Sequence, residues 1–144
     1  MTSIATRAAA VAVALALTAG AAPAVAAGTK ISARGSQFGT ILWGPNGKAI
    51  YIFQRDVRGS SRCYGECAAL WPPVYARGKP RAGAGVRSSL LGTTRRRDGR
   101  MQVTYAGKPL YYYAHEGPRQ VRCHRVNLNG GLWWVVGPNG KRRP

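Results

Sequence analysis

Short clusters of aromatic and β-branched residues, separated by turn residues, recur along the chain from residue 40 onward. Such residues favour the pleated backbone of a strand, whereas glycine, proline and asparagine end it. The Asn-Gly pair at 46–47 suits the positive φ values of a tight hairpin turn. We therefore predict a mostly β fold: a small antiparallel β domain of two pseudo-repeated hairpins with one short helix. The predicted strands cover residues 40–43, 49–53, 101–105, 110–113 and 132–136.

The layout of these segments indicates an internal duplication. The pentapeptide Gly-Pro-Asn-Gly-Lys occurs at 44–48 and again at 137–141, and a strand–turn–strand plan like that of the first half returns over 101–113. Self-similarity of this kind is typical of repeat architectures. The short helix is predicted over 66–71, where the two following prolines stop it, because proline lacks an N–H donor and restricts its predecessor.

The first 26 residues have the parts of a secretory signal peptide. Arg7 gives a positive start, an apolar run covers 8–17, and small residues lead to an Ala-Val-Ala end at 24–26. The apolar run is too short to span about 30 Å of hydrocarbon. We expect cleavage near Ala26, no transmembrane segment afterwards and, since no cysteine stands there, no lipid anchor. The predicted product is secreted or extracytoplasmic, and soluble after signal peptide cleavage.

The remainder is expected to form one domain. Residues 27–37 are predicted to be a flexible leader before a β-rich domain over 38–144. Repeat one is predicted at about 38–75 and repeat two at about 101–144. The segment between them, 76–100, is rich in Gly, Arg, Ser and Thr and is predicted to be a long connection. Connections of that length often have a function, although a wandering surface loop is the alternative.

The charge balance is the strongest compositional signal. The chain has 22 Lys and Arg against 4 Asp and Glu, a net charge of +18, and only one of the cations lies in the predicted signal. Such charge favours anionic partners, and we expect cell-wall or membrane-surface polymers. A solvated surface without a partner is the alternative. Genomic nucleic acid is not expected, since export and the lack of any zinc-finger, helix-turn-helix or RNA-binding pattern argue against it.

Two Tyr-x-aromatic-x-x-acid motifs occupy corresponding places in the two halves. The first consists of Tyr51, Phe53 and Asp56, and the second of Tyr111, Tyr113 and Glu116. With Cys-x-x-x-Cys at 63–67, Trp-Pro-Pro at 71–73 and Gly-Gly-x-Trp at 130–133, they make the chain resemble the bacterial secreted-repeat family, described as predicted lipoproteins with a Yx(F/W/Y)xxD motif. The resemblance implies a fold, export and a paired repeat, but no reaction. Two departures are the longer acid at 116 and the missing anchor cysteine.

Strand alternation places the aromatic residues of each motif on one sheet face. We predict that Tyr51, Phe53, Tyr111 and Tyr113 form the core, and that the acids cap turns or accept backbone N–H bonds. Each acid is expected beside an arginine. A polar pocket lined by the tyrosines and acids is the alternative, and a glycosidase-type carboxylate pair has no supporting context.

The chain has an odd number of cysteines: Cys63, Cys67 and Cys123. In an oxidising compartment two should pair, and the leftover thiol makes a disulfide-linked dimer conceivable. A spacing of four permits a local bridge between Cys63 and Cys67. A bridge from either of them to Cys123 is the rival; it would join the two repeats and contribute ~4 kcal/mol.

The alternative function follows from the same sulfurs. Cys63, Cys67, Cys123 and His124, with His115 as a further candidate, are a soft-ligand set for Cu(I). This set predicts an extracytoplasmic redox or copper-handling accessory protein. No catalytic residue is predicted, because Cys123 and His124 are adjacent and would point to opposite faces of a strand.

Trp133 and Trp134 are neighbours, so one should face the core and the other should not. An outward tryptophan beside arginines either grips a sugar ring or covers a sheet edge. The main prediction is a non-enzymatic, exported, envelope-associated or extracellular protein without a cofactor that binds anionic surface polymers.

Overall fold

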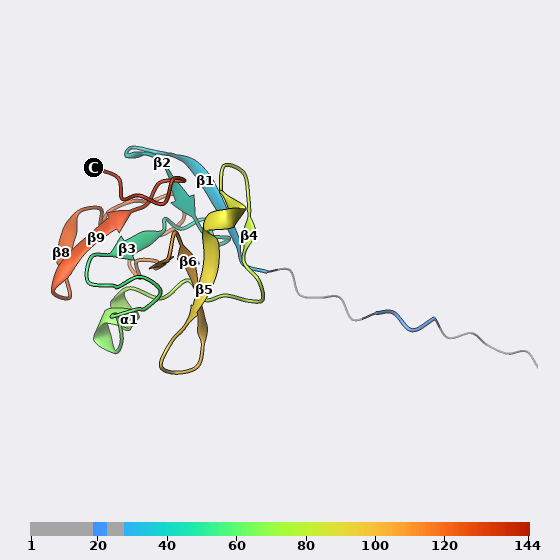
Figure 1. The fold of residues 1–144 in the computed structure, drawn as a ribbon. Helices are drawn as coiled ribbons and strands as arrows, with labels where there is room; N and C mark the ends of the chain where they lie inside the picture. Colours follow the sequence, from blue (N-terminus) through green and yellow to red (C-terminus); the bar gives the residue numbers. More distant parts are fainter. Residues whose placement is uncertain (1–18, 23–27) are drawn as a thin grey trace, which may run out of the picture.

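The computed structural model describes residues 19–22 and 28–144 (Figure 1). The predicted cleavage site at Ala26 and most of the predicted signal peptide lie outside the described residues. Within the described residues, no helix meets the length and apolarity that a membrane span requires. The folded part consists of three small sheets, one short α-helix and a single 3-10 turn, which confirms the predicted mostly β fold.

The first sheet has the order β2-β1-β4. Strands β1 (Lys30–Ser36) and β2 (Gly39–Trp43) form an antiparallel hairpin, and β4 (Arg81–Ala82) adds a short parallel edge to β1. The second sheet, β5-β6-β7, is built in the same way around an antiparallel pair. It contains β5 (Leu91–Arg95), β6 (Met101–Tyr105) and β7 (Lys108–Pro109), and η1 (Ser88–Leu90) leads into it.

The third sheet, β3-β9-β8, joins the two halves of the chain. Strand β3 (Tyr51–Phe53) pairs antiparallel with β9 (Gly131–Val135), which also pairs with β8 (Val126–Leu128). Figure 1 shows β3 lying beside β9 although they are far apart in the sequence. The predicted helix is present as α1 (Glu66–Leu70), and it ends at Trp71, directly before the two prolines.

The prediction of a flexible leader over 27–37 is wrong, because seven of its residues form β1. Only Ile31 of this strand is fully buried, and the neighbouring small and charged side chains give no alternating pattern. Five residue pairs with β2 hold the strand instead. Strand β5 was missed for the same reason, because it lies inside the predicted connection 76–100. Its central residues, Gly-Thr-Thr, are not apolar enough to predict a strand, and pairing with β6 holds it in place.

The hairpins also differ from the prediction in their partners. The turn at 44–48 forms: the Gly47 N–H donates to the Gly44 carbonyl at 3.0 Å, and Gly47 adopts a φ of 76°. Beyond the bridge between Trp43 and Ala49, however, the chain leaves β2 and crosses to β9. The hairpins are β1–β2 and β5–β6. In each repeat the hairpin consists of the first predicted strand and a strand that precedes it in the sequence, which was not predicted.

Each repeat therefore lends its motif strand to the other repeat. Tyr51 pairs with Val135, which lies in β9, the last strand of the second half. Tyr111 pairs with Pro73, near the end of the first half. At the centre, Tyr51 and Tyr111 exchange two backbone hydrogen bonds of 2.8 and 3.0 Å. The two halves are interlocked rather than merely placed next to each other.

The backbone bonding around this centre is repeated almost bond for bond. The Leu42 N–H donates to the Val136 carbonyl at 2.9 Å, and its counterpart, the Val103 N–H, donates to the Val74 carbonyl at 2.8 Å. Corresponding residues thus lie at 51 and 111, at 42 and 103, and at 74 and 136. The predicted internal duplication is confirmed at the level of the backbone.

Aromatic side chains from both halves fill the main core. Trp71 stacks on Trp133 with ring centroids 3.9 Å apart, and Trp133 also stacks on Phe53 at 4.1 Å. Tyr51 and Tyr111 meet these indoles edge-on, the geometry that aromatic quadrupoles favour. As predicted, Trp133 is fully buried whereas Trp134 points to the other face and is half-exposed.

Candidate functional site

The two motif tyrosines bind the motif acids of the opposite repeat. The Tyr51 hydroxyl donates to Glu116 Oε1 at 2.6 Å, and the Tyr111 hydroxyl donates to Asp56 Oδ2 at 2.7 Å. The strand exchange produces this crossing, because it brings each tyrosine beside the loop that follows the other motif. Four of the six motif residues thus form one cross-repeat lock, defined here as the pairs Tyr51–Glu116 and Tyr111–Asp56.

Backbone amides also bind both acids, although Glu116 Oε2 is buried without a hydrogen-bond partner among the described residues. Asp56 Oδ1 accepts the N–H of Arg62 at 2.7 Å, and Glu116 Oε1 accepts the N–H groups of Arg122 and, at 3.2 Å, Cys123. The prediction that the acids accept backbone N–H bonds is confirmed. An arginine does stand beside each acid, but it contributes its main-chain amide to the bond.

The lock keeps its tyrosines protonated. Burial raises the pKa of Tyr51 and of Tyr111, and the neighbouring Glu116 and Asp56 raise each further. Burial also raises the pKa of Asp56 to about 6, against the opposing effect of its hydrogen bonds from the Arg62 amide and Tyr111. A protonated, hydrogen-bonded phenol in a packed core is suited to holding the fold and not to nucleophilic or basic chemistry.

Arg96 is a site residue that sequence reasoning missed. It is only 3% exposed, and its guanidinium donates to Ser61 Oγ at 2.9 Å, to Gln102 Oε1 at 2.8 Å and to the Cys63 carbonyl at 2.6 Å. Ser61 in turn lies 2.7 Å from the Tyr111 hydroxyl. Arg96 is the middle residue of three consecutive arginines. It lies directly after β5 and is buried, whereas Arg95 and Arg97 are exposed.

The predicted local disulfide is present between Cys63 and Cys67, with Cα atoms 5.2 Å apart, so the rival bridge to Cys123 is wrong. Cys123 is free and 8% exposed. Cys123 follows Glu116 at the same spacing at which Cys63 follows Asp56, so Cys123 is the counterpart of Cys63. The counterpart of Cys67 is Asn127, which cannot form a disulfide. The odd count therefore reflects a duplicated position that kept only one of its two cysteines. With Cys123 buried, a dimer through this thiol requires local opening.

The candidate copper ligands are not assembled in the disulfide-bonded protein. Cys63 and Cys67 are bonded to each other, and the His124 Nδ1 accepts the Val135 N–H at 3.2 Å. Burial lowers the pKa of His124, and His115 packs edge-on against Tyr113. Across 19–22 and 28–144, no three His, Cys, Asp or Glu side chains lie together as a metal site would need. Copper binding by the reduced protein stays a prediction.

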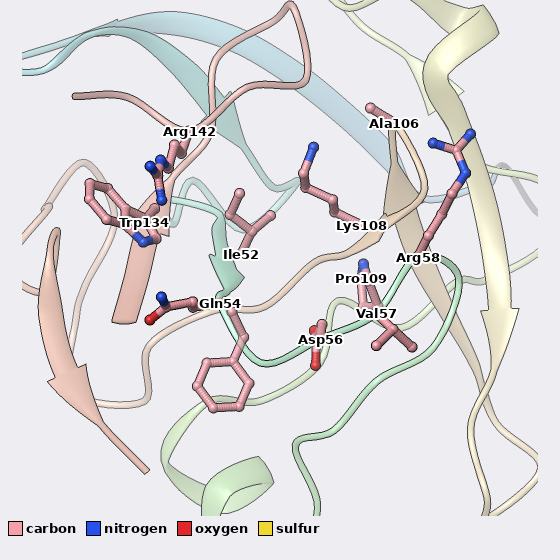
Figure 2. A pocket seen from close by; sticks show the side chains of 11 residues that line it. Ile52, Gln54, Asp56, Val57, Arg58, Ala106, Lys108, Pro109, Trp134 and Arg142 are labelled. Carbon is pink, nitrogen blue, oxygen red and sulfur yellow. The ribbon is translucent and has the colours of Figure 1, made fainter. Parts of the chain in front are cut away.

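A cleft with a cavity of about 300 Å³ lies where β3, β7, β9 and the C-terminal turn meet (Figure 2). Ile52, Pro109 and Trp134 form apolar parts of its wall. Three cations surround it: Arg58, Lys108 and Arg142. Figure 2 shows Arg142 and Trp134 on one side, Arg58 on the other and Lys108 between them, with Asp56 at the far end.

None of the bonds that position these cations involves an acid. The Arg142 guanidinium lies 4.5 Å from the centroid of the Trp134 ring, and Lys108 Nζ donates to the Gly140 carbonyl at 2.9 Å. Arg58 crosses the backbone of Gly107, where a Cβ atom would lie only 2.9 Å from Arg58 Cγ. The cations at the cleft are therefore positioned by uncharged groups, and the Asp56 carboxylate lines the far end of the same cleft.

The corresponding junction in the other repeat carries different residues at the matched positions. Tyr112 stands in place of Ile52, Pro118 in place of Arg58, and Pro72 in place of Trp134, while Lys48 keeps the cation of Lys108. The Tyr112 side chain also lies against the Gly44 backbone, so closely that a Cβ atom there would be 2.1 Å from its hydroxyl. The hollow beside Tyr112 has cations of its own, Lys30, Arg77 and Arg81, which come from other positions of the fold. The two junctions therefore share a scaffold but differ in which residues supply the positive charge.

Two interlocked copies of one β unit, joined through reciprocal tyrosine–acid bonds, define a tandem-repeat protein. A family model described as a secreted repeat of unknown function matches residues 33–75 and 92–136, and the chain belongs to this family. The comparisons with curated proteins and with solved structures found no match. The match starts each repeat earlier than the sequence prediction did, in agreement with the positions of β1 and β5.

Proposed function

We propose that this protein is an exported, non-enzymatic binder of anionic polymers at the cell envelope. The supporting observation is how its few acids are placed. Of four Asp and Glu residues, Asp56 and Glu116 bind tyrosines inside the fold, which leaves Glu66 and Asp98 as the exposed acids. The cations therefore face solvent with little compensation.

The exposed cations are spread over all three sheets and their connections. Arg96 is the one buried Lys or Arg within the described residues, and its role is internal. A surface of this kind attracts polyanions over roughly a Debye length, which is ~8 Å at physiological salt. The exposed set includes Arg55, Arg58, Arg62, Arg77, Lys79, Arg81, Arg87, Arg95, Arg97, Arg100, Arg119, Arg122, Arg125, Lys141 and Arg142.

A binding role, rather than an enzymatic one, is supported by the state of the reactive groups. The motif tyrosines have raised pKa values and are hydrogen-bonded in the core. Burial likewise raises the pKa of the Cys123 thiol, which disfavours the thiolate that a nucleophile requires. The family description as secreted agrees with a partner on the outside of the cell.

Co-sedimentation and titration with purified envelope polymers test this proposal. We expect the protein to bind an anionic wall polymer at ~0.15 M salt, to lose affinity steeply as salt rises, and to ignore an uncharged glucan of similar length. Equal binding to the two polymers, or no binding to the anionic one at that salt, would overturn the proposal.

A redox or copper-handling accessory role is the second candidate. It is supported by the location of the three cysteines in the same core, where Cys63 and Cys123 are buried and Cys67 packs against them and their neighbours. Titration of the reduced protein with Cu(I) in the presence of a competing chelator tests it. Stoichiometric uptake that the Cys123→Ser variant loses is expected; uptake weaker than that of the chelator would exclude the role.

A further inference from the structure

The cationic cleft does not end at its own cavity. A neighbouring hollow is lined by Ile52, Lys108, Lys141 and Arg142, three of which also line the cleft. The two hollows therefore adjoin each other over the junction of β3, β7 and the C-terminal turn. We call this pair of hollows the cationic track, and its cations are Arg58, Lys108, Arg142 and Lys141.

We propose that the cationic track binds the backbone of a phosphodiester polymer, with one phosphate seated in the cleft and the next beside Lys141. This inference rests on the proposed function and adds to it the binding site and the class of polymer. A track that joins two charged hollows suits a chain of regularly spaced anions better than a single small ion.

The arrangement of the cations within the cleft favours phosphate. Arg58, Lys108 and Arg142 come from three different segments and approach one cavity from different sides. A tetrahedral phosphate offers oxygens in several directions, whereas a carboxylate presents two oxygens in one plane. Arginine forks also match phosphate oxygens well, and the stacking of Arg142 on Trp134 leaves its N–H groups to a ligand.

The apolar wall accounts for the uncharged links of such a polymer. Ile52 and Pro109 are buried beneath the cations, and half-exposed Trp134 stands at the rim. A sugar or polyol that joins two phosphates has apolar C–H faces, which pack well against an indole or an aliphatic surface. The apolar surfaces of the track thus offer contacts for the polyol links between the phosphates.

Charge-matched variants separate a specific track from a diffuse positive surface. The track variant R58Q/K108Q/R142Q removes three cations from the track. The control variant R77Q/K79Q/R87Q removes three exposed cations from the connection between the repeats, none of which lines the track. Both variants have the same net charge, so a difference between them reports position alone.

The measurement is the Kd for a glycerol-phosphate polymer, a polyglutamate of matched charge and a neutral glucan at ~0.15 M salt. We expect the track variant to bind the phosphate polymer at least about tenfold more weakly than the wild type, because it loses charge-assisted hydrogen bonds to the phosphates. The control variant should lose less than about threefold. Wild-type protein should prefer the phosphate polymer to polyglutamate.

The outcomes distinguish this inference from the proposed function. Equal losses in both triple variants would overturn the track and leave general polyanion binding intact. Equal wild-type affinity for phosphate and carboxylate polymers would overturn the phosphodiester assignment. Wild-type protein that binds no polyanion would overturn both proposals.

A double variant and a fluorescence readout guard against a folding artefact. Lys108 bonds the Gly140 carbonyl, so R58Q/R142Q tests the track with that bond intact. Trp134 also reports occupancy: saturating phosphate polymer should change the fluorescence of the wild type, and Trp134→Phe should remove most of this change. A full change that persists in Trp134→Phe would place the bound polymer elsewhere.

Discussion

At the scale of single residues, the fold depends on a few buried polar groups that satisfy one another. Glu116 is 4% exposed, and its Oε1 receives the hydroxyl of Tyr51 together with two backbone amides. Asp56 is the terminus of a longer chain of bonds that runs from Arg96 through Ser61 and Tyr111. Loss of one donor leaves a buried carboxylate with fewer hydrogen bonds in a low-dielectric interior, which costs more than the bond itself contributes.

Removal of the Tyr51 hydroxyl tests this cost. We expect Tyr51→Phe to lower the free energy of unfolding by about 2–3 kcal/mol, because the buried Glu116 carboxylate loses its charge-assisted donor. Tyr112→Phe is the matched control. Burial raises the pKa of Tyr112 as well, but no acid contributes to that rise. Urea denaturation measures both, and equal effects would contradict the role assigned to the lock.

The raised pKa of Asp56 predicts a specific pH dependence of stability. Its pKa is about 6 in the folded protein against 3.8 for the free side chain, so the folded state holds the proton more tightly than the unfolded state does. The contribution to stability is therefore complete below pH ~4 and is lost as pH rises to ~6, by up to about 3 kcal/mol. Asp56→Asn should flatten the unfolding free energy across this window. An unchanged slope in that variant would assign the titration to another group.

At the scale of elements, the sequence signal was strong for some segments and absent for others. The turn at 44–48, helix α1, the inward tyrosines and the opposite orientations of Trp133 and Trp134 were predictable, because turn residues, prolines and strand alternation act locally. Strands β1, β5 and β8 were not, since ladder bonds to partners hold them more than apolar side chains do. The crossing of β3 to β9 is a long-range pairing that no local pattern encodes.

The candidate site divides in the same way. The motif residues followed from spacing, which permitted the local disulfide but also a bridge to Cys123, and the structure decides between the two. The partner of each acid depended on the crossing and could not be predicted. Arg96 and the cationic cleft were missed because arginine is so abundant that no single one stands out. The signal that could have pointed to the cleft is the comparison of the two repeats, in which Arg58 and Trp134 replace prolines.

Strand β1 gives an element-scale prediction. A chain that begins at residue 38 should be less stable than one that begins at 28 by at least about 3 kcal/mol, because it loses fully buried Ile31 and leaves β2 unpaired. Thermal and urea unfolding of the two chains provide the comparison. Equal stabilities would restore the interpretation of this segment as a dispensable leader.

At the scale of the whole molecule, neither repeat contains its own complete core. Trp71 of the first half stacks on Trp133 of the second, and each motif tyrosine lies on a strand paired with the other half. The disulfide, in contrast, lies within the first half. The domain is therefore one cooperative unit despite its duplicated sequence, and unfolding should be two-state by circular dichroism and by tryptophan fluorescence.

Fragments test this cooperativity directly. We expect residues 28–86 and 87–144 to be unfolded when each is alone, because both aromatic stacking and the cross-repeat lock need the second half. Mixed together, they should recover the β-sheet circular dichroism of the intact chain in a concentration-dependent manner. A cooperative unfolding transition in either fragment alone would show that a repeat is an independent domain.

The unequal junctions have a consequence for how such a protein can be altered. The lock and the stacked indoles of Trp71 and Trp133 hold the two halves together. Exposed side chains at one junction can therefore be substituted, and the unchanged junction in the other repeat serves as a control. Replacement of Pro118 by arginine would place a cation at the position that corresponds to Arg58 in the other repeat. In a duplicated scaffold of this kind, the surface of one repeat can change while the shared interior stays the same.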